Sequence, residues 1–141
     1  MNRFHVIGVA YDTAGFERLS ELSLSSVEAE GLGVALTERG VSDFVVLSTC
    51  NRLEIYTAGE AAPTIDVVLE IAALRPKARI AQRDFFVKSG VDALKHLFRV
   101  VGGLESLVVG ETEITGQIKE AHRMATEHGW VQSTGLRRAF D

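Results

Sequence analysis

The sequence predicts an α+β domain with a ferredoxin-like fold, in which helices pack on a four-stranded antiparallel sheet. Segments that favour strands and helices follow one another in the order β-α-β-β-α-β-α-α, which is typical of such a sheet covered on one face by helices. The chain has 141 residues, of which 46% are hydrophobic and 24% charged. This length and composition fit a single soluble globular domain that spans residues 1–141.

Four segments have the composition of strands. Phe4–Ala10 is dense in β-branched and aromatic residues, and Phe44–Ser48 is a continuous apolar run of strand length. Leu53–Thr57 alternates Leu, Ile and Thr with Glu and Tyr, which predicts a strand buried on one face. Phe85–Lys88 is a fourth, shorter strand. Thr49–Arg52 must therefore form a tight connection between the second and third strands.

Four further segments have helical periodicity together with start or stop residues. These are residues 27–39, which end at Gly40; 63–74, with Pro63 in the first turn; 90–101; and 112–128, which end at Gly129. In the third, we predict a buried apolar stripe formed by Val91, Leu94, Phe98 and Val101. Leu136 and Phe140, at spacing i, i+4, resemble the start of another amphipathic helix whose partner lies outside the chain.

Charge and apolar content disfavour several classes of protein. The net charge is −4 and the basic residues are scattered, so the domain alone should bind RNA weakly. An RNA-binding module is further disfavoured because no aromatic platform has basic neighbours. No run approaches the roughly 20 apolar residues of a membrane span, and the N-terminus is no secretory signal. A single cysteine forms no internal disulfide, which favours a reducing, cytoplasmic setting.

Cys50 is the first candidate for chemistry. A lone cysteine is most often a small buried hydrophobe. Here Thr49, Asn51 and Arg52 surround it with polar groups at the exit of an apolar strand, where reactive groups are often placed. Arg52 would favour the thiolate, which is the nucleophilic form. From these residues alone, a reactive and a structural cysteine are about equally favoured.

Two helical residues are further candidates. His96 lies at the margin of the stripe on residues 90–101, where a histidine is more often a packing residue than a catalyst. It becomes a partner for Cys50 only if that helix edge faces the thiol. Gln117 falls within the apolar side of the last helix. It either lies at the stripe's edge in water or points into a polar pocket together with Glu113.

The sequence contains neither a dinucleotide fingerprint nor a metal-binding pattern. The glycines at Gly102, Gly103 and Gly110 do not form GxGxxG between a strand and a helix. Four histidines and one cysteine are too widely spaced for zinc. We therefore predict no nicotinamide site and no metal within this chain.

Two long motifs resemble the glutamyl-tRNA reductase family. Residues 48–56, STCNRLEIY, are similar to the family's STCNR(T)E(x)Y signature. Residues 96–111, HLFRVVGGLESLVVGE, resemble HLFRVxxGL(D/E)SLVxGE, and residues 116–119 continue that motif. The motifs have the family's order and approximate spacing, and the resemblance spans essentially the whole chain.

The resemblance implies a function. Family members release tRNA from glutamyl-tRNA by forming a cysteine thioester, which NADPH reduces to glutamate-1-semialdehyde on the way to 5-aminolevulinate and tetrapyrroles. By this likeness Cys50 is the nucleophile, His96 is an acid/base or orienting group, and Arg52 pairs with a substrate carboxylate. The glutamyl pocket implied by the likeness comprises Thr49, Asn51, Arg52, Ser106, Glu111, Thr112, Glu113 and Gln117.

The same resemblance implies an N-terminal catalytic domain, with the family's NADPH-binding and dimerisation domains beyond residue 141. The chain would then form the thioester without completing the reduction. Implied partners are glutamyl-tRNA, a second subunit and the downstream aminomutase. Two segments depart from the family: residues 10–15 replace an NHKTAP-like sequence, and residues 110–114 read GETEI instead of GEPQI. These departures support an alternative, a non-catalytic ferredoxin-like module that binds a ligand or a partner.

Overall fold

The computed structural model describes residues 3–10, 14–102, 113–133, 136 and 139–140, with backbone alone at Phe16 and at residues 113–115. Four strands form one antiparallel sheet in the order β2-β3-β1-β4. The strands are β1 (Arg3–Ala10), β2 (Phe44–Ser48), β3 (Arg52–Gly59) and β4 (Phe86–Ser89). This order confirms the predicted ferredoxin-like sheet, because the two strands that follow helical crossovers lie at its edges.

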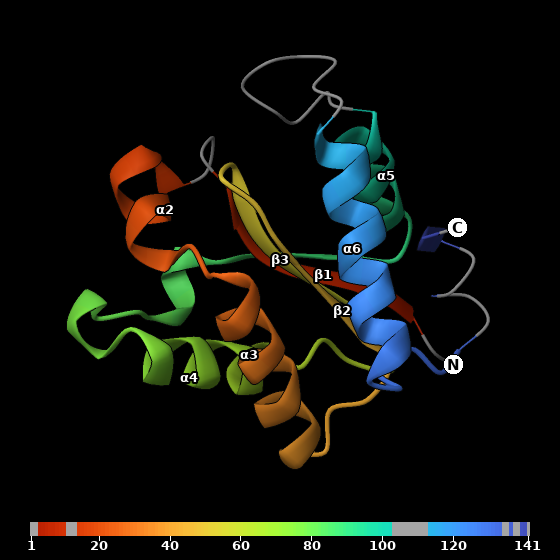
Figure 1. The fold of residues 1–141 in the computed structure, drawn as a ribbon, viewed down its shortest axis with the longest axis horizontal. Coiled ribbons are helices and arrows are strands. Elements are labelled where there is room, and N and C mark those ends of the chain that lie inside the picture. Colours follow the sequence, from red (N-terminus) through yellow and green to blue (C-terminus); the bar gives the residue numbers. More distant parts are fainter. Residues whose placement is uncertain (1–2, 11–13, 103–112, 134–135, 137–138, 141) are drawn as a thin grey trace.

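Helices pack on both sides of the sheet (Figure 1). The helices α2 (Phe16–Leu22), α3 (Ser26–Glu38) and α4 (Thr64–Leu74) lie on one side, whereas α5 (Val91–Val101) and α6 (Glu113–Glu127) lie on the other. The expectation of a single covered face was therefore wrong. It was wrong because α5 and α6 follow the complete βαββαβ unit and bury the face that this unit leaves open.

The helix and strand boundaries follow local sequence signals. Ser25 caps α3: its hydroxyl accepts from the Glu28 backbone N–H, while the Glu28 carboxylate accepts from the Ser25 N–H. Gly40 follows α3 with a positive φ of 90°, as predicted for a helix stop. Helix α2 was not predicted. Two short 3-10 turns, Pro76–Ala78 and Gln82–Asp84, lie between α4 and β4.

Helix α5 buries a different stripe from the predicted one. Ala93, His96, Leu97 and Val100 face the interior, whereas Val91 and Phe98 are 67% and 59% exposed. Both sets have i, i+3 or i+4 spacing, so periodicity alone could not choose between them. Packing against the sheet decides which face of α5 is buried, because His96 on the buried face meets a polar side chain on β3.

The chain end also differs from expectation. Leu136 and Phe140 are both buried within this chain. The Phe140 ring contacts the ring of Tyr56 edge-on, with centroids 5.3 Å apart. Phe140 therefore packs on strand β3 of the same chain and Leu136 is buried as well, so the expectation of a missing partner was wrong.

The apolar core is continuous across the sheet. Strand β3 is buried on both faces, with Leu53, Ile55 and Tyr56 all inaccessible to solvent, so the prediction of one solvated face was wrong. At the edge strand β2, Trp130 stacks on Phe44 with ring centroids 5.0 Å apart. Among the described residues, no helix combines the length and apolar character needed to cross a membrane.

Candidate functional site

Cys50 lies in the three-residue connection of the β2–β3 hairpin, and its side chain is exposed. The Thr49 N–H donates to the Arg52 carbonyl over 2.8 Å, and the Thr49 hydroxyl accepts from the Asn51 N–H over 3.1 Å. Thr49 itself is buried. The predicted tight connection is confirmed: the thiol stands on a short loop that is anchored to a rigid sheet.

Ser48 connects this hairpin to the segment that precedes α3. Its hydroxyl donates to the Leu24 carbonyl over 3.2 Å and lies 3.3 Å from the Leu24 backbone nitrogen. The first turn of α3 is thereby held beside the end of β2. Because β2 also runs alongside α6, three elements meet next to the Cys50 loop.

A cavity of about 520 Å³ lies where these elements meet. One wall is the start of α3 and the other is α6, with the end of β2 between them. It is lined by Leu24, Ser25, Ser26, Ala29, Val46, Ser48, Gly116, Gln117, Glu120, Ala121 and Met124. Gln117 is half-buried in the α6 wall, which favours the pocket interpretation over an amide lying in water.

Beneath the hairpin, a buried polar cluster centres on the carboxylate of Glu54. Its Oε2 atom lies 2.5 Å from His96 Nε2 and 3.3 Å from an Arg52 guanidinium nitrogen. Its Oε1 atom accepts from the Tyr56 hydroxyl over 2.7 Å. Arg52 and Glu54 are inaccessible to solvent, and His96 is 5% exposed. The cluster therefore joins two residues singled out in the sequence, Arg52 and His96, through one that was not.

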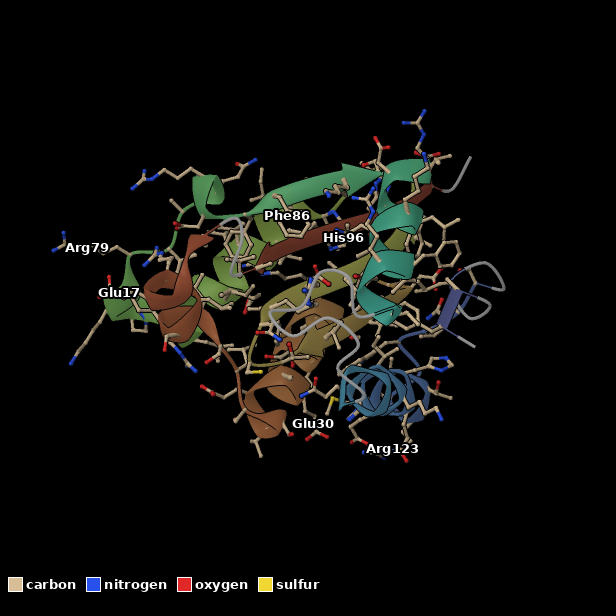
Figure 2. All side chains as sticks on the ribbon, turned by 90° about the horizontal axis from the view of Figure 1, so that it is seen from above. Glu17, Glu30, Arg79, Phe86, His96 and Arg123 are labelled. Atoms are coloured by element: carbon tan, nitrogen blue, oxygen red, sulfur yellow. The ribbon has the colours of Figure 1, made fainter. Side chains whose placement is uncertain are left out.

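Strand geometry explains why the cluster forms. Side chains at alternate positions share one face of a strand, so Arg52, Glu54 and Tyr56 project together from β3. Helix α5 crosses that face and points His96 at the carboxylate. Figure 2 shows His96 on α5 beside the ring of Phe86, and the two ring centroids are 5.1 Å apart.

The charge of Glu54 is stabilised by its neighbours. Burial alone would raise the pKa of the Glu54 carboxyl. The hydrogen bond from His96, the positive charge of Arg52 and the hydrogen bond from Tyr56 act in the opposite sense. Their combined effect holds the pKa of Glu54 below its usual value, so the carboxylate is ionised at neutral pH.

The other ring nitrogen of His96 faces β4. The Lys88 ammonium lies 3.4 Å from His96 Nδ1, and both side chains line a cavity of about 290 Å³ together with Asp92, Lys95 and Arg99. Both nitrogens of the imidazole thus have a polar neighbour. Among the described residues, no hydrogen bond links His96 to Cys50.

The remaining predicted site residues are placed only in part. Ser106, Glu111 and Thr112 lie outside the described residues, and Glu113 is described only as the first residue of α6. Asn51 is half-buried in the Cys50 loop. In the part of the chain that the structure describes, no group of three or more His, Cys, Asp or Glu side chains could hold a metal ion.

Sequence reasoning missed Glu54, Tyr56 and Lys88. The signal for the first two was present, because an Arg-x-Glu-x-Tyr pattern places three polar side chains on one strand face. We interpreted that face as solvated. Lys88 carried no comparable signal, since its proximity to His96 depends on how α5 returns over β4.

Comparisons with known proteins identify the family. A family model described as "Glutamyl-tRNAGlu reductase, N-terminal domain" matches residues 7–141. The chain is 40% identical over 136 residues to the glutamyl-tRNA reductase of Thermus thermophilus, a match that covers 96% of this chain and 32% of that protein. It is 37% identical over 135 residues to that of Aquifex aeolicus, with 93% and 32% covered.

A solved structure agrees with the sequence comparisons. Glutamyl-tRNA reductase from Methanopyrus kandleri superposes with a TM-score of 0.73 at 33% identity, covering 97% of this chain and 32% of that one. The chain therefore spans about a third of the length of the relatives it matches. On these matches, the chain belongs to the glutamyl-tRNA reductase N-terminal domain family.

Proposed function

We propose that Cys50 takes the glutamyl group from glutamyl-tRNA and holds it as a thioester. The sulfur would form a bond to the ester carbonyl carbon, the bond from that carbon to the ribose oxygen would break, and the thiol proton would pass to the leaving ribose hydroxyl. The observation that supports this most is the exposed Cys50 thiol on a short, anchored hairpin loop. Such a thiol is accessible to a large acyl donor without opening the core.

The glutamyl group would be held by residues around this loop. We assign this role to Thr49, Asn51, Arg52, Ser106, Glu111, Thr112, Glu113 and Gln117. Gln117 supports the assignment because it lines the 520 Å³ cavity beside the hairpin. In this assignment Arg52 pairs with the substrate carboxylate from its buried position beneath the loop, and His96 acts as an acid/base or orienting group behind the loop.

In the whole protein, the thioester would be reduced with NADPH to glutamate-1-semialdehyde, the first step toward 5-aminolevulinate and tetrapyrroles. The described residues do not fit NADPH, because the sheet is antiparallel and has no strand-to-helix turn of the dinucleotide-binding type among them. We therefore propose that NADPH binds outside these 141 residues. We further propose that the whole protein is a cytoplasmic homodimer and that it passes its product to the aminomutase.

Acid-quenched trapping of labelled glutamate tests the acyl transfer. The 141-residue chain is mixed with glutamyl-tRNA and, separately, with a glutamyl ester of adenosine, which has the reactive ester without the rest of the tRNA. We expect label on the wild type that hydroxylamine releases, and none on Cys50→Ser. Ser23→Ala is the matched control: it changes a hydroxyl elsewhere on the surface and should label like the wild type.

The ester of adenosine makes a negative result informative. If folded wild-type chain takes label from neither donor, the acyl-transfer proposal is wrong, and a binding module becomes the better account. Label found on Cys50→Ser at any position other than 50 would also contradict the proposal, because the acceptor would then be another residue.

A further inference from the structure

The Glu54 carboxylate contacts more groups than the single cation of a simple ion pair. Its two oxygens are shared among Arg52, His96 and Tyr56, at 3.3, 2.5 and 2.7 Å respectively. A carboxylate with three charged or polar neighbours in a solvent-free interior is held in one orientation. Each neighbour is in turn oriented by the carboxylate.

The facing strand leaves room for this carboxylate. Gly8 on β1 is paired with Glu54 on one side and with Phe86 on the other. A Cβ atom at this position would lie 2.8 Å from Glu54 Cγ and 3.0 Å from both the Leu53 carbonyl oxygen and Phe86 Cζ. The close approach of two backbones and two side chains here requires a glycine.

The geometry also assigns the protons of His96. An ionised Glu54 carboxylate only accepts hydrogen bonds, so the 2.5 Å contact requires a proton on Nε2. That proton is present whether the imidazole is neutral or cationic. The position where the ring gains or loses a proton is therefore Nδ1, the nitrogen next to Lys88.

We propose that Glu54 is the positioning residue of this site: it fixes the Nε2–H form of His96 and the guanidinium of Arg52 together, so that His96 exchanges protons through Nδ1 alone. Arg52 is two residues from Cys50, which couples the carboxylate to the reactive loop. This inference rests on the proposed acyl transfer. It does not require Glu54 to touch the substrate.

Glu54→Gln tests the inference, since it keeps the shape of the side chain and removes its charge. An amide can turn its NH₂ group toward His96, which then loses the enforced Nε2 proton. In an active site where a carboxylate orients a histidine, the same change lowers the turnover rate about 10⁴-fold. We expect a fall of at least about 100-fold in the rate of thioester formation, with the half-saturating glutamyl-tRNA concentration changed less than about threefold.

Two comparisons separate positioning from a general loss of structure. Glu28→Gln, the same chemical change at an ion pair on α3, should leave the rate unchanged. Glu54→Asp, which restores the charge on a shorter side chain, should recover part of the rate.

Nitrogen-15 NMR of the histidine rings gives a readout that does not depend on acyl transfer. We expect a protonated Nε2 on His96 in the wild type and a loss of this preference in Glu54→Gln. A His96 with its proton on Nδ1 alone would overturn the inference. So would equal labelling rates for the wild type and a folded Glu54→Gln. A wild type without label but with a protonated Nε2 would refute the proposed function and leave the proton assignment standing.

Discussion

The two faces of strand β3 are equally buried and chemically opposite. Leu53 and Ile55 project into an apolar layer, whereas Arg52 and Glu54 project into a network of charges, and all four side chains are inaccessible to solvent. On the apolar face the requirement is volume, because contacts there are non-directional. On the polar face the requirement is a partner for every charge, because a buried charge without one is costly.

This difference indicates where function is placed. The polar face lies directly behind the Cys50 loop and holds His96 and Arg52, while the apolar face holds the sheet to α3 and α4. A buried ion pair often contributes little net stability compared with apolar residues of similar size. The presence of this cluster in the core is therefore better explained by positioning than by stability.

Breaking the polar face should have the largest effect on stability. Arg52→Met leaves the Glu54 carboxylate buried without its neighbouring cation, and we expect a loss of ~3–5 kcal/mol in the free energy of unfolding. Urea titration followed by circular dichroism measures this loss. Arg75→Met, which breaks the partly exposed pair with Glu28, is the control and should lose much less. Equal losses of unfolding free energy in the two variants would mean that burial does not determine how much stability is lost when an ion pair is broken.

Truncation on the apolar face should come next. Ile55→Ala removes buried methyl groups and leaves a cavity, for which we expect a loss of about 3 kcal/mol in the free energy of unfolding. Ile55→Val should lose about 1 kcal/mol. At a temperature where Ile55→Ala remains folded, its labelling rate should match that of the wild type. A strong fall in that rate would contradict the separation of roles between the two faces.

Two glycines of helix α3 allow a test of packing in which the expected change in stability is smaller. A Cβ atom at Gly33 would overlap the indole ring of Trp130, whereas Gly31 in the same helix has open space around it. We expect Gly33→Ala to lose about 2 kcal/mol and Gly31→Ala to gain about 0.5–1 kcal/mol from helix propensity. Thermal unfolding of the pair measures both effects. If Gly33→Ala were more stable than the wild type, the Trp130 ring could not lie against position 33.

The smallest expected effect is a decrease in the free energy of unfolding at acid pH. Hydrogen bonds from Arg75 and from the Ser25 backbone lower the pKa of Glu28 to about 2, and the pKa of Glu54 is also lowered. A depressed pKa gives stability above the unfolded-state value of about 4.3, and this stability is lost as pH falls through the native value. The free energy of unfolding should therefore decline from about pH 5 toward pH 2. Glu28→Gln should reduce this slope, and an unchanged slope would contradict the pairing with Arg75.

The fold was predictable from the sequence to the extent that local signals determined it. The bounds of β2 are those predicted from a single apolar run, and α3 has its predicted stop at Gly40. The buried face of α5 was not predictable, because two apolar sets with helical spacing compete and only the position of Glu54 selects the set that contains His96. The burial of Phe140 against Tyr56 likewise depends on a long-range contact.

The candidate site was predictable where it depends on local sequence and unpredictable where it depends on long-range contacts. The hairpin loop around Cys50 is a local feature, so the sequence placed it correctly between two strands. The Glu54 cluster joins residues 42 positions apart in the chain, and nothing in the sequence near His96 indicates a carboxylate partner. Alternation along β3 showed that Arg52 and Glu54 share a face, but it could not show that this face is dry.

The measurement that most directly tests the role of Cys50 is peptide mass analysis after a single turnover. The chain is mixed briefly with glutamyl-tRNA, quenched in acid, digested under acidic conditions and searched for a peptide that has gained one glutamyl group. The account predicts this gain on the peptide that contains Cys50, and its loss after hydroxylamine treatment. A glutamyl group on any other peptide, or a Cys50 peptide that stays unmodified while tRNA is deacylated, would contradict it.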